Sequence, residues 1–298
     1  MTGSYILAQL VNGLILGSMY ALIAIGFSMI YGIVRLINFA HGDIFTIGAF
    51  ATLASLAVAH APFPIAVAIV LAVGALAGVI IERAAFRPMR GAPQVTGFIA
   101  SLAVAIILEN LAVITISAQP RTFVMPAYLG QLLTLGTLSF RVIDVVIVVL
   151  AIVLMVALVC FVRFTKVGVA MRATAENYDV ARLMGINIDR MITMAFAIGS
   201  ALAATAGLMW GSKYGQISPL MGLLPGLKAF VAAVIGGVGS IPGAMLGGYV
   251  LGMSEVLFVG LLPPEFSGYR NAFVFGALIL VLLVMPNGFL GRNTEGRA

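Results

Sequence analysis

The sequence predicts an all-α integral membrane protein, a bundle of about eight or nine transmembrane helices. Of its 298 residues, 62% are hydrophobic and only 9% are charged, whereas about 25% of a soluble domain is charged. The mean hydropathy is +1.17. Apolar runs recur along the chain, and about 20 such residues cross a bilayer as a helix. We therefore expect residues 1–298 to form a single transmembrane domain.

The apolar runs give eight predicted spans and one weaker region. The spans lie near residues 5–30, 44–60, 63–82, 97–117, 142–162, 191–211, 243–262 and 272–290. The weaker region, 226–242, starts with an apolar stretch of about half a span and continues into Gly236–Gly243. Counted as a crossing, this region gives nine helices; as a re-entrant hairpin, it gives eight.

The distribution of basic residues predicts the orientation. Eleven of the 16 basic residues fit on one side: Arg35, Arg83, Arg87, Arg90, Arg163, Lys166, Arg172, Arg182, Arg190, Arg292 and Arg297. The other five fall outside: Arg121, Arg141, Lys213, Lys228 and Arg270. Cytoplasmic loops collect Lys and Arg, so the larger set is expected in the cytoplasm. An outside N-terminus and an inside C-terminus follow, which requires an odd number of crossings.

Composition and motifs argue against several classes of function. One cysteine, Cys160, and two histidines, His41 and His60, exclude a disulfide framework and leave little for a zinc or haem centre. No Gly-Lys pair occurs, so the chain has no Walker A phosphate loop. The basic residues are spread between apolar runs, which argues against nucleic-acid binding. We expect a non-catalytic protein without metal or cofactor.

Two polar or glycine-rich breaks interrupt the apolar pattern. Asn38–Asp43 and Gly236–Gly243 each precede a resumed apolar run. Broken helices at matching places in two halves are typical of inverted-repeat transporters, so an inverted repeat with a broken or re-entrant segment is one interpretation. The preferred interpretation of Asn38–Asp43 is plainer: a polar cytoplasmic turn that caps the second helix.

Polar residues at membrane depth supply the candidates for a translocation path, because ionisable groups there are costly and often functional. Glu109 and Glu255 each lie inside a predicted span. They suit either a proton relay or, more commonly, buried hydrogen-bonded carboxylates. Three further acids lie at span ends, where water is expected to solvate them: Asp43, Glu82 and Asp144. The candidate path residues are Asn12, Asn38, His41 and Glu109.

Small residues spaced four apart predict close contacts between helices, because such residues let helix backbones approach in lipid. The spacing occurs at Gly13 and Gly17, Gly74 and Gly78, Gly199, Ala203 and Gly207, Gly243 and Gly247, and Gly248 and Gly252. Ordinary packing is the favoured interpretation, and a moving interface is the alternative.

The long cytoplasmic connection, about 163–190, contains a predicted short helix. Ala175–Met184 has no Gly or Pro, and Gly185 follows, as is typical of a helix C-terminus. Its apolar face comprises Ala181, Leu183 and Met184. Such a helix suits docking in another protein's groove or lying on the membrane surface, and the pattern leaves both open.

Motifs along nearly the whole chain resemble the branched-chain amino acid permeases of bacterial ABC importers, the LivH and LivM family. Ala175–Asn177, Ala181 and Gly185–Asn187 resemble the EAA-type coupling loop of ABC permeases. The other matching segments are Asn12–Gly26, Ile37–Asp43, Gly236–Gly243 and Pro286–Gly288. Length and the short start are closer to the LivH type.

The resemblance implies a multi-pass subunit of the bacterial inner membrane. It implies two cytoplasmic ATP-binding subunits that hydrolyse ATP, a second LivM-like permease and a periplasmic binding protein. Coupling would fall on Arg172, Glu176, Asn177, Ala181 and Gly185. Tyr178 stands where the family often has proline. Permeases for urea, short amides or sugars remain alternatives, as does an ion-coupled secondary transporter that would use Glu109 and Glu255.

Overall fold

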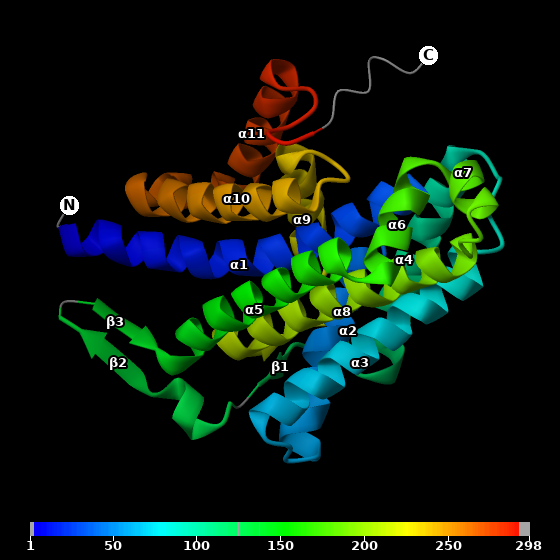
Figure 1. The fold of residues 1–298 in the computed structure, drawn as a ribbon. Helices are drawn as coiled ribbons and strands as arrows, with labels where there is room; N and C mark the ends of the chain where they lie inside the picture. Colours follow the sequence, from blue (N-terminus) through cyan, green and yellow to red (C-terminus); the bar gives the residue numbers. More distant parts are fainter. Residues whose placement is uncertain (1–2, 124, 137, 292–298) are drawn as a thin grey trace.

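The computed structural model describes residues 3–291 apart from 124 and 137, and this part of the chain is a bundle of helices (Figure 1). Seven helical segments are long and apolar enough to cross a membrane. They contain α1 (Gly3–Val34), α3 (Phe63–Ile81), α4 (Gln94–Thr115), α5 (Val142–Phe164), α8 (Ile188–Tyr214), α10 (Ile241–Leu261) and α11 (Arg270–Val284). The predicted all-α membrane architecture is confirmed.

Shorter elements complete the structure. The short helices are α2 (His41–Leu53), α6 (Lys166–Glu176), α7 (Tyr178–Leu183) and α9 (Leu223–Gly236), with π-helical turns η1 (Ala54–Val58) and η2 (Glu82–Phe86) and 3₁₀ turns η3 (Ala127–Gly130) and η4 (Pro264–Tyr269). Two antiparallel pairs join β1 (Arg121–Thr122) to β4 (Gln216–Ile217), and β2 (Leu132–Leu135) to β3 (Leu138–Arg141). These strands are additions that the sequence pattern did not predict.

The bundle has two ends, with α7 at one and the β2–β3 hairpin at the other (Figure 1). We call them the α7 end and the hairpin end. Helix α1 runs from the hairpin end to the α7 end, because Asn12 near its start lines a pocket with residues of the hairpin. Near its other end, the Ile33 carbonyl accepts a hydrogen bond from Tyr178 in α7. Lys228 was predicted to lie outside with four other basic residues. It does not lie in an outer loop, because it is buried within α9. Arg292 and Arg297 lie outside the described residues.

The chain turns back into the bundle after α1. Residues 35–40 have no regular helix or strand, and α2 then begins with His41, whose Nε2 lies 3.2 Å from the Ile23 carbonyl oxygen. Ile23 precedes the end of α1 by 11 residues, or about 16 Å along the helix axis. Helix α2 therefore begins at mid-depth. The preferred sequence interpretation, a solvated polar turn at Asn38–Asp43, is wrong, because Asn38, His41 and Asp43 are all buried.

A second inward turn follows α8. Residues 215–222 lead to α9, and a Cβ on Gly42 at the start of α2 would overlap the backbone of Gly222 and approach Gly226. Helices α2 and α9 thus begin side by side. From that point α9 leads to the α7 end, where Gly239 bonds to Ser28 near the close of α1, while α2 leads away from it to the start of α3.

The two halves pack as an inverted repeat. Helix α1 packs against α9 and α10, as α8 packs against α2 and α3, and α4 and α11 contact α2 and α9 in turn. We call α1–α4 the first repeat and α8–α11 the second repeat; α5–α7 link them. The break that matches residues 35–40 is 215–222. The sequence pattern had paired Asn38–Asp43 with Gly236–Gly243 instead, and that pairing is wrong. If each inward segment and the half-helix after it are counted together as one crossing, they add two to the seven long helices of the described residues, which gives nine.

Glycines line several close contacts between the repeats. A Cβ on Gly252 would overlap Gly17 in α1, and a Cβ on Gly78 would overlap Ser200 in α8. At the centre, a Cβ on Gly26 would overlap the Gly199 carbonyl. The predicted role of the small-residue pattern in helix packing is confirmed.

Candidate functional site

The residues predicted to couple the chain to a partner lie together at the α7 end. The segment Ala175–Met184 is not one helix, as the sequence suggested, but two. Asn177 separates α6 from α7 with an extended backbone (φ −156°). Its side-chain oxygen accepts hydrogen bonds from the N–H groups of Asp179 and Val180 at 2.9 and 3.1 Å. This N-cap starts a new helix in a new direction, because it satisfies N–H groups that have no partner within the helix.

Helix α7 ends as predicted, at Gly185. Gly185 has a φ of 78° and donates its N–H to the Arg182 carbonyl, while Ile186 donates to the Ala181 carbonyl at 3.1 Å. This pair of bonds is a Schellman motif, which favours glycine because other residues resist positive φ. Ala181 is buried on the inner side of α7. Asn177 therefore fixes where α7 begins, Gly185 fixes where it ends, and Ala181 packs it against the rest of the protein.

Two contacts attach α7 and α6 to the first repeat. The Tyr178 hydroxyl donates to the Ile33 carbonyl, and Arg35 donates to the Ala175 carbonyl at 3.4 Å. Burial raises the pKa of the Tyr178 phenol, so the hydroxyl stays protonated and able to donate. Tyr178, noted in the sequence only as a departure from the family pattern, is thus a direct link between α7 and α1.

A charged cluster ties the neighbouring helices together at the same end. Arg90 binds both Glu82 in η2 and Asp189 in the first turn of α8. Arg87 adds a bond to Asp189 at 3.0 Å, and Thr193 donates to Glu82 at 2.9 Å. The cluster joins the close of α3 to the start of α8. A displacement of this end is therefore shared by both repeats.

The outer side of α7 is apolar and uncovered. Leu183 is 87% exposed and Met184 is 77% exposed, and Val180 next to them is also exposed. Arg172 and Glu176 are exposed on α6, and Arg172 donates to the Arg163 carbonyl at 3.4 Å. An apolar tip on a firmly held helix is suited to a groove in another protein.

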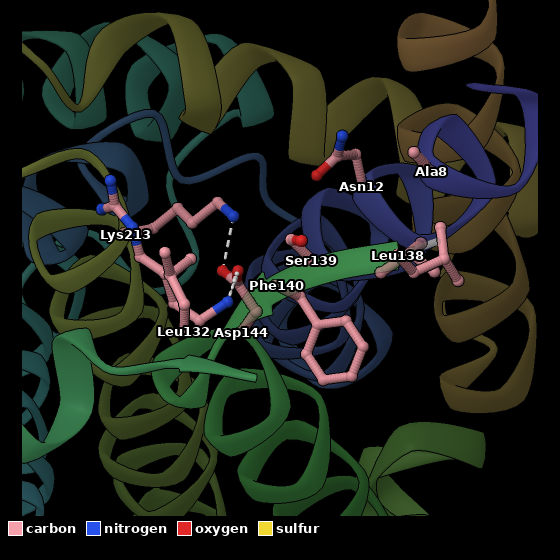
Figure 2. A pocket seen from close by; sticks show the side chains of 10 residues that line it. Ala8, Asn12, Leu132, Leu138, Ser139, Phe140, Asp144 and Lys213 are labelled. Atoms are coloured by element: carbon pink, nitrogen blue, oxygen red, sulfur yellow. Dashed lines mark hydrogen bonds and ion pairs between the residues drawn. The ribbon is translucent and has the colours of Figure 1, made fainter. Parts of the chain in front are cut away.

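Of the four residues predicted for a translocation path, only Asn38 and His41 lie together. Asn12 lies in α1 at the hairpin end, beside a pocket of about 300 Å³. Figure 2 shows it apart from the ion pair between Lys213 and Asp144 that forms another part of this pocket. Asn12 is exposed and contributes only to this outer hollow.

Asn38 and His41 lie where the first inward segment meets α2. Neither polar atom of the Asn38 side chain has a hydrogen-bond partner, and His41 Nδ1 has none either. Both residues are buried, at 2% and 1% exposure. Buried polar groups without partners cost free energy, which marks this junction as a place where polar groups are held for a purpose other than stability.

Glu109 lines a second pocket, of about 380 Å³, with Asp43. We call it the α2–α4 pocket. Glu109 is half-buried in α4 and Asp43 is 5% exposed at the start of α2. Glu109 and Glu255, the two acids that the alternative of a secondary transporter would use, do not lie together, because Glu255 is in the second repeat and bonds to Lys228 at 2.7 Å.

Three acids placed by sequence at solvated span ends are in fact buried. Glu82 and Asp144 are held by Arg90 and Lys213 respectively. Asp43 has no such cation among the described residues. Lys213 lies 69 residues from Asp144 in the chain, so no local pattern could have revealed that pair. Arg90 lies only eight residues from Glu82, whereas Asp43 follows a polar run and precedes an apolar one.

Comparison with known proteins identifies the family. The family described as "Branched-chain amino acid transport system / permease component" matches residues 9–283. The permease protein LivH of the Escherichia coli K12 high-affinity branched-chain amino acid transport system is 40% identical, covering 97% of this chain and 96% of that protein. BraD of Pseudomonas aeruginosa is 40% identical, covering 96% of each.

A more limited likeness extends to a sugar system. The xylose transport system permease protein XylH of Escherichia coli K12 is 33% identical over 43% of this chain and 34% of that protein. No solved structure matches the chain. The match over most of its length and the high identity to LivH and BraD show that the chain belongs to the family of branched-chain amino acid transport system permease components.

Proposed function

We propose that this ABC importer permease subunit carries branched-chain amino acids across the bacterial inner membrane. Its proposed partners are two cytoplasmic ATP-binding subunits, a second LivM-like permease and a periplasmic binding protein. The names of the relatives support the substrate. The absence of a Gly-Lys pair from the sequence supports placing ATP hydrolysis on the partners.

The α7 end is proposed to face the cytoplasm. Nine basic residues that the sequence assigns to the inner side lie in or beside the elements gathered there, as the positive-inside rule requires. The single transmembrane domain then presents the connection 163–190 to the ATP-binding subunits. The hairpin end faces the periplasm and the binding protein.

The observation that carries the coupling role is the exposed apolar tip of α7. Leu183 and Met184 are exposed beyond the membrane spans, yet α7 is capped by Asn177 and bonded to α1 through Tyr178. An ATP-binding subunit that receives this tip can move α7 as a rigid body. Arg172 and Glu176 lie beside the tip on α6, where they contribute charged contacts at the rim of the interface.

Force on α7 reaches both repeats through the contacts at this end. Tyr178 leads to α1, and the charged cluster around Arg90 joins α3 to α8. The repeats meet where Gly26 contacts Gly199, so rocking about this crossing opens one face and closes the other. Asn38 and His41, at the junction of the half-helices, lie on the proposed path. Inverted-repeat transporters alternate access in this way, with the substrate site near mid-depth.

ATP-dependent uptake in proteoliposomes tests the coupling. The complete complex is reconstituted with its binding protein, and radiolabelled leucine is supplied. Leu183→Asp is expected to reduce uptake by at least about tenfold, because docking would bury a carboxylate in an apolar groove. Leu183→Met is the matched control and keeps wild-type uptake. Normal uptake by Leu183→Asp would refute docking through α7.

A sugar importer is the second candidate function, favoured by the partial likeness to XylH. The same proteoliposomes distinguish the two, because an excess of unlabelled xylose competes with leucine only if the pathway accepts both. Uptake that persists without the ATP-binding subunits and follows a pH gradient would instead identify an ion-coupled transporter.

A further inference from the structure

The α2–α4 pocket combines an apolar wall with three oxygen-bearing side chains. Its apolar residues include Ile47, Phe50 and Leu108, and its polar side chains are Asp43, Thr46 and Glu109. Pro219, from the second inward segment, lines it as well. The pocket therefore lies where the two repeats meet, between α2 and α4.

The two carboxylates in this pocket hold no cation within the described chain. The three other strongly buried acids, Glu82, Asp144 and Glu255, each form an ion pair with Lys or Arg. Asp43 is just as buried as these three. Two like charges in one apolar pocket at membrane depth are unfavourable unless a positive group joins them or one of the carboxylates binds a proton.

Thr46, which lines the same pocket, is a further buried polar group without a partner. Its side chain is 4% exposed, and its hydroxyl oxygen has no hydrogen-bond partner. The backbone amides at the start of α2 are already bonded, because His41, Asp43 and Ile44 donate to carbonyls of the preceding turn. With these amides occupied, the polar groups that line the pocket itself are the carboxylates of Asp43 and Glu109 and the hydroxyl of Thr46, a set that suits a donor-rich cation better than an anion.

The chemistry of the lining selects among cations. A hard metal ion takes six or more oxygen ligands, but three oxygen-bearing side chains in an otherwise apolar wall do not supply them. A primary ammonium has three N–H donors and needs no further ligands. The neighbouring apolar surface on Phe50 and Leu108 suits a branched hydrocarbon chain.

We propose that the α2–α4 pocket binds the α-ammonium group of the transported amino acid, with Asp43 and Glu109 as its acceptors and Thr46 as the third. The substrate's aliphatic side chain packs on Ile47, Phe50 and Leu108. This assignment rests on the proposed function and deepens it, because it names the substrate group that the permease itself recognises. It gives Glu109 a specific role on the predicted translocation path.

Equilibrium binding of radiolabelled leucine to the purified complex, without the binding protein, tests the site. Asp43→Asn and Glu109→Gln are each expected to weaken binding by roughly tenfold or more, because a charged hydrogen bond is lost. Glu109→Asp should retain part of the affinity. An excess of 4-methylpentanoate, which is leucine with its ammonium replaced by hydrogen, should not displace the label.

Control measurements keep the result interpretable. Glu265→Gln, at an exposed acid of the hairpin end, should bind leucine as the wild type does, and size-exclusion profiles verify that every complex is assembled. Unchanged leucine binding in both Asp43→Asn and Glu109→Gln overturns the proposal. So does loss of the second permease from the Glu109→Gln complex with leucine affinity preserved, because the missing cation would then belong to that partner.

Failure of the proposed function can be distinguished from failure of the ammonium site. If the wild-type complex takes up no leucine with ATP and binding protein present, the substrate assignment is wrong and the ammonium site falls with it. If leucine uptake is normal and the two variants bind leucine as the wild type does, only the ammonium site is wrong. If a proton gradient alone drives uptake, the carboxylates carry protons and the proposal is overturned.

Discussion

The first repeat, α1–α4, and the second repeat, α8–α11, pack their helices alike but treat buried charge differently. In the second repeat, Glu255 bonds to Lys228 at 2.7 Å, to the Tyr20 hydroxyl at 3.0 Å and to Arg270 at 3.1 Å. In the first repeat, Asp43 and Glu109 line a pocket with no cation from the described residues. The same helix arrangement thus holds a fully paired charge network in the second repeat and unpaired acceptors in the first.

This difference separates a structural task from a binding task. A buried pair that is complete fixes the register of α9 against α10, and breaking it leaves an uncompensated charge. Acceptors without a partner cost stability and are retained where a ligand supplies what is missing. The two repeats have similar helix packing, and in our proposal the placement of charges determines which of them binds the substrate.

The largest expected effect comes from opening the closed network. Glu255→Gln leaves Lys228 buried without its carboxylate, which should cost about 3–5 kcal/mol of stability. We expect a strongly reduced yield of purified complex and a lower unfolding midpoint. Replacing both Lys228 and Glu255 by Met should restore most of the loss. An unchanged midpoint in Glu255→Gln would show that the network contributes nothing.

Glycine contacts should matter equally in the two repeats. A leucine at Gly78 would overlap Ser200, and a leucine at Gly252 would overlap Gly17. Each substitution should destabilise the protein by about 1–3 kcal/mol or more through overpacking, measured as the shift of the unfolding midpoint. Leu76→Ala, at an exposed position of α3, is the control. A large effect in one repeat alone would break the structural equivalence.

The linker between the repeats should affect coupling without affecting substrate affinity. Asn177→Ala removes the N-cap of α7, a loss of about 1 kcal/mol, so α7 is held less firmly. Leucine uptake per ATP hydrolysed should fall a few-fold, while leucine binding to the purified complex stays unchanged. Asn177→Asp retains a capping oxygen and should behave like the wild type; weaker leucine binding in Asn177→Ala would contradict the separation of roles.

The smallest effect should have the opposite sign. Asp43→Asn removes a buried charge that lacks a cation. The free energy of unfolding without substrate should therefore stay equal or rise by up to about 1 kcal/mol, and the unfolding midpoint should stay equal or rise with it. Thermal unfolding of the purified complex measures it beside Glu255→Gln. A fall as large as that of Glu255→Gln would mean that Asp43 has a stabilising partner.

Much of the fold follows from local sequence, and the departures have physical causes. The spans and the helix end at Gly185 follow from hydropathy and from the backbone freedom of glycine. The burial of Asn38–Asp43 does not, because it depends on the contact of His41 with Ile23, 18 residues away in the chain. A polar run at the end of a span reads as a solvated turn unless the long-range fold is known.

The candidate sites show the same division. The motif around Asn177 and Gly185 predicts the proposed coupling surface, because its residues are adjacent in sequence. The pairing of Asp43 with Glu109, and of Lys228 with Glu255, joins different helices and is set by tertiary packing. Lys228 was placed outside on the basis of its charge, since no local signal reveals that a carboxylate in α10 faces it.

The leucine-induced shift of the unfolding midpoint, compared between wild type and Asp43→Asn, tests most directly whether the first repeat holds the substrate. A ligand that binds only the folded state raises its stability, by about 2.7 kcal/mol at a hundred times its Kd. We predict that leucine raises the midpoint of the wild-type complex and that the same concentration leaves Asp43→Asn almost unchanged. A leucine shift of equal size in both complexes would contradict the account.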